Sequence, residues 1–470
     1  MTRWLVFLCA TLPSLAFAQE GSTELSLEDV WRSTEAHHPR VAAAMANEAM
    51  ARSELQAARG GFDPVIDITA KLRTGGYYEL RRLDVEITQP TPLWGAEVYA
   101  GYRVGLDVGE NSYPDYYSDQ TRGGGELRVG LRVPLWRDGP LDARRAARTR
   151  AEIGIDAAEQ NLQWTAITLR QSATDAYFAW VAAGRRASVA DQLLALAETR
   201  QRWVDARVAA GAIAEIESLE ARRSVLSRRA KRISAQRSVE RTALVLSLFL
   251  RTSSGQPRLA DNSTLPQVLP LPPAEPPLAV TQDADTARAA LACNPLLRQK
   301  IASLQSARLS RDLAQAQRAP RVDAFFGASR DFGEGSETLG GNVLEAGLVF
   351  SMPLAMRTAR GRLGAAEANV RILTEEVRFL EDQLLARIAD AESARRNAVE
   401  QYAIVAELLE AVERLAQAER MRFEAGSTSL FVVNQREQSL AEAAVAEVDA
   451  AREQWVARAR VTALASCVAP

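Results

Sequence analysis

Few side chains in this sequence could do chemistry. The 470 residues include 2 His and 3 Cys, which leaves little material for zinc, haem or iron–sulfur sites. His37 and His38 are adjacent, but two neighbouring histidines alone rarely bind a metal. No Ser-His-Asp or paired-carboxylate constellation stands out. We therefore expect no catalytic residue, no metal and no other cofactor.

The composition is that of a folded protein without a preference for polyanions. Lys and Arg number 57 against 59 Asp and Glu, which gives a net charge of −2, and apolar residues make up 47% of the chain. The apolar fraction is typical of globular proteins. The near balance of charge predicts no nucleic-acid partner.

Residues 1–18 have the pattern of a signal peptide. Arg3 precedes an apolar run, Trp4–Leu15, which is too short to cross a bilayer, and Ala16-Phe17-Ala18 has the small residues of a cleavage site. We expect the chain from Gln19 onward to be exported. No other stretch approaches 18 continuous apolar residues.

The remaining sequence contains two internal repeats. Proline is absent from Leu141–Gln256 and from Leu354–Ala469, two windows of equal length. Because proline breaks helices, these windows predict two helical pairs. The predicted domains are a first repeat at 19–256 (strands about 64–134, helical hairpin about 141–250), a proline-rich linker at 257–280, and a second repeat at 281–470 (strands about 320–353, helical hairpin about 357–465).

Within the proline-free windows, apolar residues recur every seven positions, which is the spacing of coiled coils. Three sets follow this interval: Ile155, Leu162, Leu169 and Ala176; Leu219, Leu226 and Ile233; Val370, Val377, Leu384 and Ala391. A helix over 141–208 would be about 100 Å long at 1.5 Å per residue.

Outside these windows the apolar pattern has a period of two, which predicts strands with one apolar and one polar face. It occurs in six runs, at 66–73, 83–88, 98–107, 127–133, 322–329 and 346–352. A half-buried soluble sheet and a membrane barrel both give this pattern. Trp94 and Trp136 at strand ends favour the membrane boundary. Six strands cannot enclose a water-filled bore, so several chains would share the barrel.

This organisation resembles the TolC-like outer membrane factor family over essentially all of the mature chain. The most specific mark is a helical-turn motif, which reads Arg207-Val208-Ala209-Ala210-Gly211 in the first repeat and Arg422-Phe423-Glu424-Ala425-Gly426 in the second. The resemblance implies a mainly α-helical fold with membrane β-structure. Strands from a homotrimer would close one outer-membrane β-barrel, and the helices would form a coiled-coil barrel across the periplasm.

The resemblance also implies a function. The helical turns would meet a periplasmic adaptor (membrane fusion) protein and, through it, an inner-membrane pump of the RND or ABC type, and the barrel would contact outer-membrane lipid. The chain would conduct substrates to the outside, in efflux or type I secretion. A secreted or periplasmic coiled-coil scaffold or adhesin without a pore is the alternative for the same heptads.

Four residues of the turn motif are candidates for shaping the tip and docking the adaptor: Arg207, Gly211, Arg422 and Gly426. Glycine permits the sharp reversal, and arginine in the last helical turn complements exposed carbonyl groups. Capping of the helix alone would also explain the arginines.

Three copies of Glu217, helped by Glu215, could ring a pore constriction, where carboxylates favour cations. Outward orientation or pairing with nearby arginines such as Arg223 is the alternative. Cys293 and Cys467 would both lie in the equatorial region of the family fold, where a disulfide between them is possible.

The sequence departs from the family pattern in three places. The family usually has two strands per repeat, but the first repeat here has four. A trimer would then have eighteen barrel strands rather than twelve, or the added hairpin would stand outside the barrel. Val432 occupies a position that is usually acidic, and Ala214 replaces a usual serine.

Overall fold

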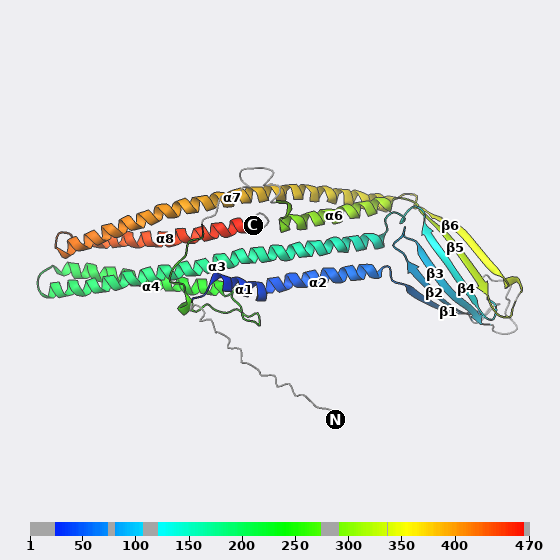
Figure 1. The fold of residues 1–470 in the computed structure, drawn as a ribbon, viewed down its shortest axis with the longest axis horizontal. Coiled ribbons are helices and arrows are strands. Elements are labelled where there is room, and N and C mark those ends of the chain that lie inside the picture. The colour runs from blue at the N-terminus through cyan, green and yellow to red at the C-terminus, as the bar shows by residue number, and fades with distance from the viewer. Residues whose placement is uncertain (1–23, 74–79, 107–120, 274–290, 336, 465–470) are drawn as a thin grey trace, which may run out of the picture. The chain divides into compact units, whose positions relative to one another are not determined.

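The computed structural model describes residues 24–73, 80–106, 121–273, 291–335 and 337–464 (Figure 1). The expected signal peptide, residues 1–18, lies outside these ranges. The helices are α1 (Leu27–His37), α2 (Pro39–Gly60), α3 (Ala143–Ala209), α4 (Glu215–Leu246), α6 (Pro295–Ala316), α7 (Arg357–Glu424) and α8 (Leu430–Leu464), with short 3-10 turns η1 (Asn262–Thr264) and η3 (Glu337–Leu339). The strands are β1 (Val65–Arg73), β2 (Leu80–Pro90), β3 (Glu97–Leu106), β4 (Glu126–Pro134), β5 (Arg321–Asp331) and β6 (Asn342–Ser351).

The chain divides into two compact units, and each unit draws on both halves of the sequence. The first unit contains 24–38, 169–273 and 394–460. The second contains the described residues of 39–168 and 276–393, and 461–464. Helices α3 and α7 contribute residues to both units. In the part of the chain that the structure describes, no helix is long and apolar enough to span a membrane.

The second unit contains one antiparallel sheet with strands in chain order, β1-β2-β3-β4-β5-β6 (Figure 1). Strand β4 pairs with β5, from Glu126 opposite Asp331 to Pro134 opposite Asp323, so the two sequence halves meet within the sheet. The six period-two runs are these six strands. The additional hairpin of the first half, β1 with β2, pairs along β3 and belongs to the same sheet.

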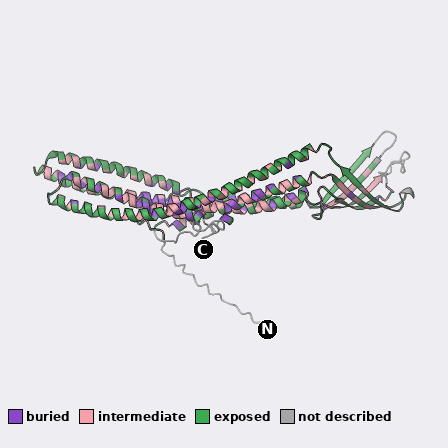
Figure 2. Ribbon diagram, turned by 90° about the horizontal axis from the view of Figure 1, so that it is seen from above, coloured by how far each residue is buried: buried purple, intermediate pink, exposed green. Residues whose placement is uncertain are grey.

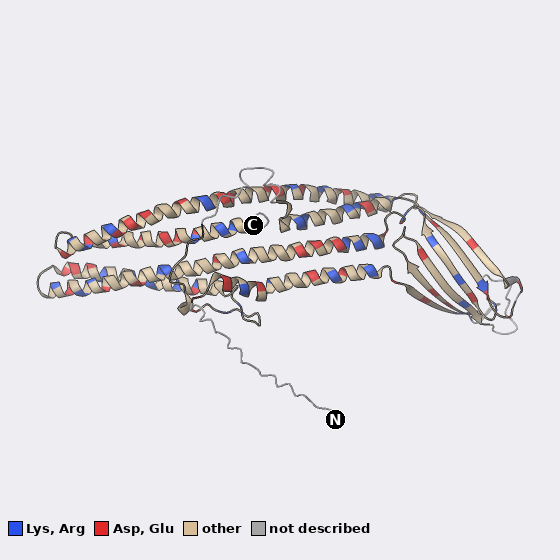
Figure 3. Cartoon of the chain, viewed as in Figure 1, with Lys and Arg blue, Asp and Glu red and all other residues tan. Residues whose placement is uncertain are grey.

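One face of the sheet is apolar and exposed. Figure 2 colours much of the strands as exposed or intermediate. Ile66, Ile87, Val129 and Leu344 share one cross-strand row, through Ala100 and Ala328. Their side chains are not covered by the chain itself: Ile66 is 60% exposed and Leu344 is 83% exposed. The opposite face carries basic and acidic residues (Figure 3). The mainly helical class with a strand sheet is therefore confirmed.

The first unit has the largest apolar core. Phe178 and Trp180 of α3 are almost fully buried, and they pack with Val30 of α1 and Leu246 at the end of α4. Trp455 of α8 stacks on Phe178 with ring centroids 4.5 Å apart. This core therefore joins α1, α3, α4 and α8.

The proline-rich segment is better packed than its composition suggests. A proline-rich composition predicts an extended, poorly packed linker, but its described part, up to residue 273, belongs to the first unit. The indole of Trp455 donates to the carbonyl of Pro270 (2.6 Å), and Arg185 donates to that of Gln267 (2.6 Å). Leu265 lies against Gly184, where a Cβ would collide with it. Extended chain leaves its carbonyl groups free to accept such bonds.

One heptad stripe does not form a helix–helix contact within the chain. Leu219, Leu226 and Ile233 of α4 are 58%, 54% and 61% exposed, whereas Ala221 and Val225 on another face are buried. The stripe read from the sequence is therefore an unpartnered surface of the single chain, and the interior contact uses smaller residues.

Shortening Phe178 should weaken the core of the first unit. We expect Phe178→Ala to lower the free energy of unfolding by about 3–5 kcal/mol, because a cavity would form beneath Trp455. Phe178→Leu preserves more volume and should cost under about 1.5 kcal/mol. Denaturant unfolding followed by tryptophan fluorescence measures both. Equal losses for the two variants would contradict a packing role.

Candidate functional site

The first helical hairpin reverses at Gly211, one of the predicted tip residues. Gly211 has a positive φ of 69°, and its N–H donates to the carbonyl of Val208 (2.9 Å). The N–H of Ala212 donates to the carbonyl of Arg207 (2.9 Å). This pair of bonds is a Schellman motif, which ends a helix through a left-handed residue and favours glycine there.

The second hairpin repeats the same device at Gly426, which has a φ of 75°. Its N–H donates to the carbonyl of Phe423 (3.0 Å), and that of Ser427 donates to the carbonyl of Arg422 (2.8 Å). The hydroxyl of Ser427 adds a bond to the same Arg422 carbonyl (2.9 Å). Thus both predicted glycines, and the backbones of both predicted arginines, have corresponding positions in two equal turns.

The two turns lie close together in the first unit. Trp203 of α3 and Phe423 of α7 approach with ring centroids 5.3 Å apart. The guanidinium of Arg207 lies 4.8 Å from the centre of the Trp203 ring. Arg422 is 3.4 Å from Glu419 and its side chain is 60% exposed. The Arg207 side chain therefore packs on Trp203, while Arg422 presents most of its side chain outward.

The predicted constriction residues lie in the first turn of α4. Glu215 is exposed and Glu217 is half-buried. Among the described residues neither has an ion-pair partner, because Arg223 pairs with Glu220 instead. Carboxylates at this place are stabilised by the N-terminal end of the helix dipole. Whether three copies form a ring stays a prediction.

The start of α4 lacks a side-chain cap. Ala214 has the extended backbone of an N-cap residue (φ −71°, ψ 149°), and its methyl group cannot accept from the helix amides. The serine expected from the family pattern would supply this bond. The sequence departure at Ala214 therefore leaves the first turn of α4 held more weakly than a capped helix.

A buried carboxylate near the turns was not predicted from the sequence. Glu437 of α8 is fully buried and forms ion pairs with Arg200 of α3, Arg228 of α4 (2.8 Å) and Arg420 of α7 (3.1 Å). One side chain thus connects all four helices of the two hairpins. The sequence does contain a pattern that could have indicated it. Glu437 follows Leu430 by seven residues and therefore occupies a heptad position that is normally apolar.

The charge state of Glu437 follows from these neighbours. Burial by itself raises the pKa of the carboxyl, but hydrogen bonds and positive charge from Arg200 and Arg228 outweigh burial and lower the pKa below its ordinary 4.5. Since the folded-state pKa is depressed, the ionised carboxylate stabilises the fold above the unfolded-state pKa. This contribution is lost as the pH falls through the folded-state pKa.

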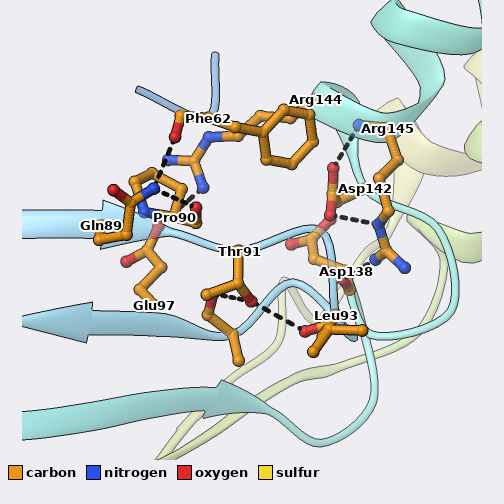
Figure 4. Close-up of polar contacts among 11 residues, drawn as sticks. Phe62, Gln89, Pro90, Thr91, Leu93, Glu97, Asp138, Asp142, Arg144 and Arg145 are labelled. Carbon is orange, nitrogen blue, oxygen red and sulfur yellow. Dashed lines mark hydrogen bonds and ion pairs between the residues drawn. The ribbon is translucent and has the colours of Figure 1, made fainter. Parts of the chain in front are cut away.

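The strand-to-helix joint in the second unit is held by Arg145. Figure 4 shows Asp138, Asp142 and Arg145 where the chain leaves β4 and enters α3. Asp142 accepts from both the backbone N–H and the Nε of Arg145 (2.8 Å each) and so caps α3. The remaining guanidinium nitrogens donate to the carbonyls of Asp138, Gly139 and Pro140 (2.9, 2.6 and 3.1 Å).

The polar face of the sheet carries mutually paired charges. Asp84 of β2 accepts from Arg82 (2.7 Å) and from Arg128 of β4 (2.6 Å). Arg103 of β3 donates to Glu126 of β4 (2.6 Å). Cross-strand pairs of opposite charge stabilise an antiparallel sheet. The face is therefore suited to contact with water, although much of its charge is internally compensated.

The remaining candidates are the cysteines and the adjacent histidines. Cys293 is disulfide-bonded, but Cys467 lies outside the described residues, so a bond between them stays a prediction. His38 is buried and stacks on Phe249 at 6.0 Å. Over the described ranges, no group of three or more His, Cys, Asp or Glu residues could hold a metal ion.

A cap at the start of α4 should stabilise the first turn. We expect Ala214→Ser to slow hydrogen exchange of the Ile216 and Glu217 amides about five-fold, since an N-cap contributes about 1 kcal/mol. Ala212→Ser makes the same change two residues earlier and should leave these amides unaffected. Equal protection in both variants would rule out capping as the cause.

Removal of the Glu437 charge should destabilise the first unit. Glu437→Gln leaves three guanidinium groups without their carboxylate and should cost about 3–5 kcal/mol at pH 7. Glu424→Gln, at an exposed site at the end of α7, should change the free energy of unfolding by less than about 0.5 kcal/mol. Denaturant unfolding between pH 7 and pH 3 measures both. The deficit of Glu437→Gln should shrink below pH 4.5, and a constant deficit would contradict the pKa assignment.

Comparison with known proteins agrees with this architecture. The outer-membrane channel OprN aligns with a TM-score of 0.66 at 18% identity, covering 93% of this chain and 89% of that chain. CmeC, an outer membrane channel of Campylobacter jejuni, aligns at 0.66 and 15%, covering 98% and 94%. VceC, an outer membrane protein of Vibrio cholerae, aligns at 0.64 and 17%, covering 93% and 96%. These structures share the fold of this chain.

The sequence itself supplies the family assignment. No curated protein sequence matches the chain. The family model for outer membrane efflux proteins matches residues 116–250 and 286–466, more than half of the chain. The resemblance to TolC-like channels is therefore confirmed, and the protein is a transport protein rather than an enzyme. This chain belongs to the outer membrane efflux protein family.

Proposed function

We propose that the protein is an outer-membrane channel that conducts substrates from the periplasm to the outside, in efflux or type I secretion. The observation that carries this proposal is the two-faced sheet. Leu344 and Leu348 are 83% and 69% exposed on one face, whereas the other face carries paired charges. Lipid would cover the apolar face, and water in a bore would contact the polar face.

We further propose that three copies close one barrel. The edges of the sheet are β1 and β6, and open edges invite pairing with further strands. Joining β6 of one copy to β1 of the next would give eighteen strands in a trimer. The place of the β1–β2 hairpin within the sheet supports eighteen over twelve.

The helices would extend this assembly into the periplasm as a coiled-coil barrel. The exposed stripe of Leu219, Leu226 and Ile233 supports this proposal, because a neighbouring copy could cover it. The protein would then lie in the outer membrane with its helices in the periplasm. The two internal repeats would supply equivalent hairpins around the bore.

The helical turns would dock a periplasmic adaptor protein and, through it, an inner-membrane pump of the RND or ABC type. Open space surrounds the positions where Gly211 and Gly426 would carry a Cβ, so both turns are accessible to a partner. Arg422 offers an exposed charge beside the second turn. Glu217 would line the narrow end of the bore, and the energy of transport would come from the pump.

A charge on the apolar face tests the barrel directly. We expect Leu348→Arg to cost up to about 2–4 kcal/mol by placing a cation against lipid. Val349→Arg introduces the same side chain one residue later, on the polar face, and should be tolerated. The yield of heat-modifiable trimer in outer-membrane fractions and the conductance of reconstituted protein in planar bilayers measure the difference.

Two outcomes would overturn the proposed function. Equal trimer yields for Leu348→Arg and Val349→Arg would mean that the apolar face does not contact lipid. Wild-type protein that stays dissolved without detergent as a single subunit would exclude the shared barrel.

A further inference from the structure

An open hollow of about 420 Å³ lies where the polar face of the sheet meets the start of α3, within the second unit. Its charged lining comes from β3, β4, β5, the loop before α3 and the first turn of α3. The lining residues with charged side chains are Glu97, Arg132, Arg137, Asp138, Asp142, Arg144, Arg321 and Asp323. Figure 4 shows part of this wall around Glu97, Asp138, Asp142 and Arg144.

The four carboxylates of the hollow are each paired with an arginine other than Arg132. The pairs are Glu97 with Arg144 (2.8 Å), Asp138 with Arg137 (3.7 Å), Asp142 with Arg145 (2.8 Å) and Asp323 with Arg321 (2.6 Å). Glu97 lies opposite Arg132 in the sheet register but is engaged by Arg144. Among the described residues that line the hollow, Arg132 is thus the cation left without a carboxylate.

Arg132 is instead held by an aromatic ring. Its guanidinium lies 5.0 Å from the centre of the Tyr99 ring, which is a cation–π arrangement. The Tyr99 ring lies flat because glycines occupy the strands beside it: a Cβ on Gly130 would overlap the ring, and one on Gly327 would lie 2.9 Å from its hydroxyl. Gly130 and Gly327 are cross-strand partners, so neither strand has a side chain where the Tyr99 ring lies.

A second aromatic residue lies on the strand next to Arg132. Phe325 of β5 is the cross-strand partner of Arg132, and its ring lies over Gly347 of β6. Arg132 is exposed, so the part of its guanidinium that Tyr99 does not contact is available to a ligand. A guanidinium can donate two parallel hydrogen bonds to a carboxylate and can stack on an aromatic plane.

We propose that Arg132 is a recognition point for planar organic anions, with aromatic carboxylates as the ligand class. The anion would accept hydrogen bonds from the free edge of the guanidinium, and its ring would stack on the guanidinium face opposite Tyr99. This inference rests on the proposed function in one respect: a ligand reaches Arg132 during transport only if the polar face lines the bore. The hollow itself is formed by a single chain.

The test uses purified trimer in detergent with 2-naphthoate as the probe and uncharged 2-naphthalenemethanol as the reference. Wild type should bind 2-naphthoate about ten-fold more tightly than the alcohol, as one exposed charge-assisted pair allows. Arg132→Gln should abolish this preference. Arg132→Lys keeps the charge but not the planar guanidinium, and should retain only part of the preference for 2-naphthoate. Titration calorimetry or ligand-observed NMR gives the affinities.

Arg137→Gln is the matched control, because it removes a cation from the same hollow that is already engaged by Asp138. It should leave the ten-fold preference intact. An equal loss in Arg137→Gln and Arg132→Gln, or no preference in wild type, would overturn the proposal. Conductance of the same preparations separates the two proposals. Protein that conducts but does not prefer 2-naphthoate would contradict only the anion site. Protein that prefers 2-naphthoate but does not conduct would contradict the proposed channel.

Discussion

Apolar surface that the single chain leaves uncovered constrains the rest of this structure. A sheet can bury an apolar face only against another layer, and among the residues that the structure describes no helix or second sheet covers the row from Ile66 to Leu344. Burial of a large aliphatic side chain is worth about 1.5–3 kcal/mol, so a face with many such residues represents a large unmet driving force. Monomeric soluble proteins rarely expose so much contiguous apolar surface. Lipid and further copies of the chain are the two coverings that this surface fits.

The same constraint operates on the helices with a different period. On α4, buried contacts use residues such as Ala221, while larger ones such as Leu226 and Ile233 remain outside. Small residues allow two helices of one chain to approach closely, and the larger residues are left for a wider contact with another helix. The period-two strands and the Leu219 stripe of α4 therefore both present apolar surface that the described chain does not cover, whereas heptad residues such as Leu169 and Leu384 are buried within it.

Local periodicity explains why so much of the fold could be predicted from the sequence. Alternation fixes which face a strand side chain occupies, so the runs at 66–73 and 346–352 indicated both a strand and its two faces. Proline-free heptads and the two glycine motifs likewise indicated the two hairpins, because a helix and its Schellman turn are determined by neighbouring residues. The sequence could not decide which heptad face meets which helix. That choice depends on packing between distant segments, so the sequence did not indicate that the Leu219 stripe would be exposed in the single chain.

The unpredicted contacts are those that arginine makes over long separations. Arg200 and Glu437 are 237 residues apart, and the local sequence around either residue does not predict their pairing. Arg145 binds three carbonyl groups of one loop, which only the folded loop brings together.

In each case the planar fork of arginine satisfies several acceptors at once, which lysine cannot do in the same geometry. Much of the polar surface can therefore be hydrated while its local net charge stays near zero, since its charges compensate one another at short range. Against such a background a few uncompensated groups dominate the local field. In the assembly proposed above, Glu217 at the helical turns and Arg132 at the sheet would be such groups, of opposite sign and in different units. A passing solute would then be sorted by these isolated charges rather than by the total charge of the wall.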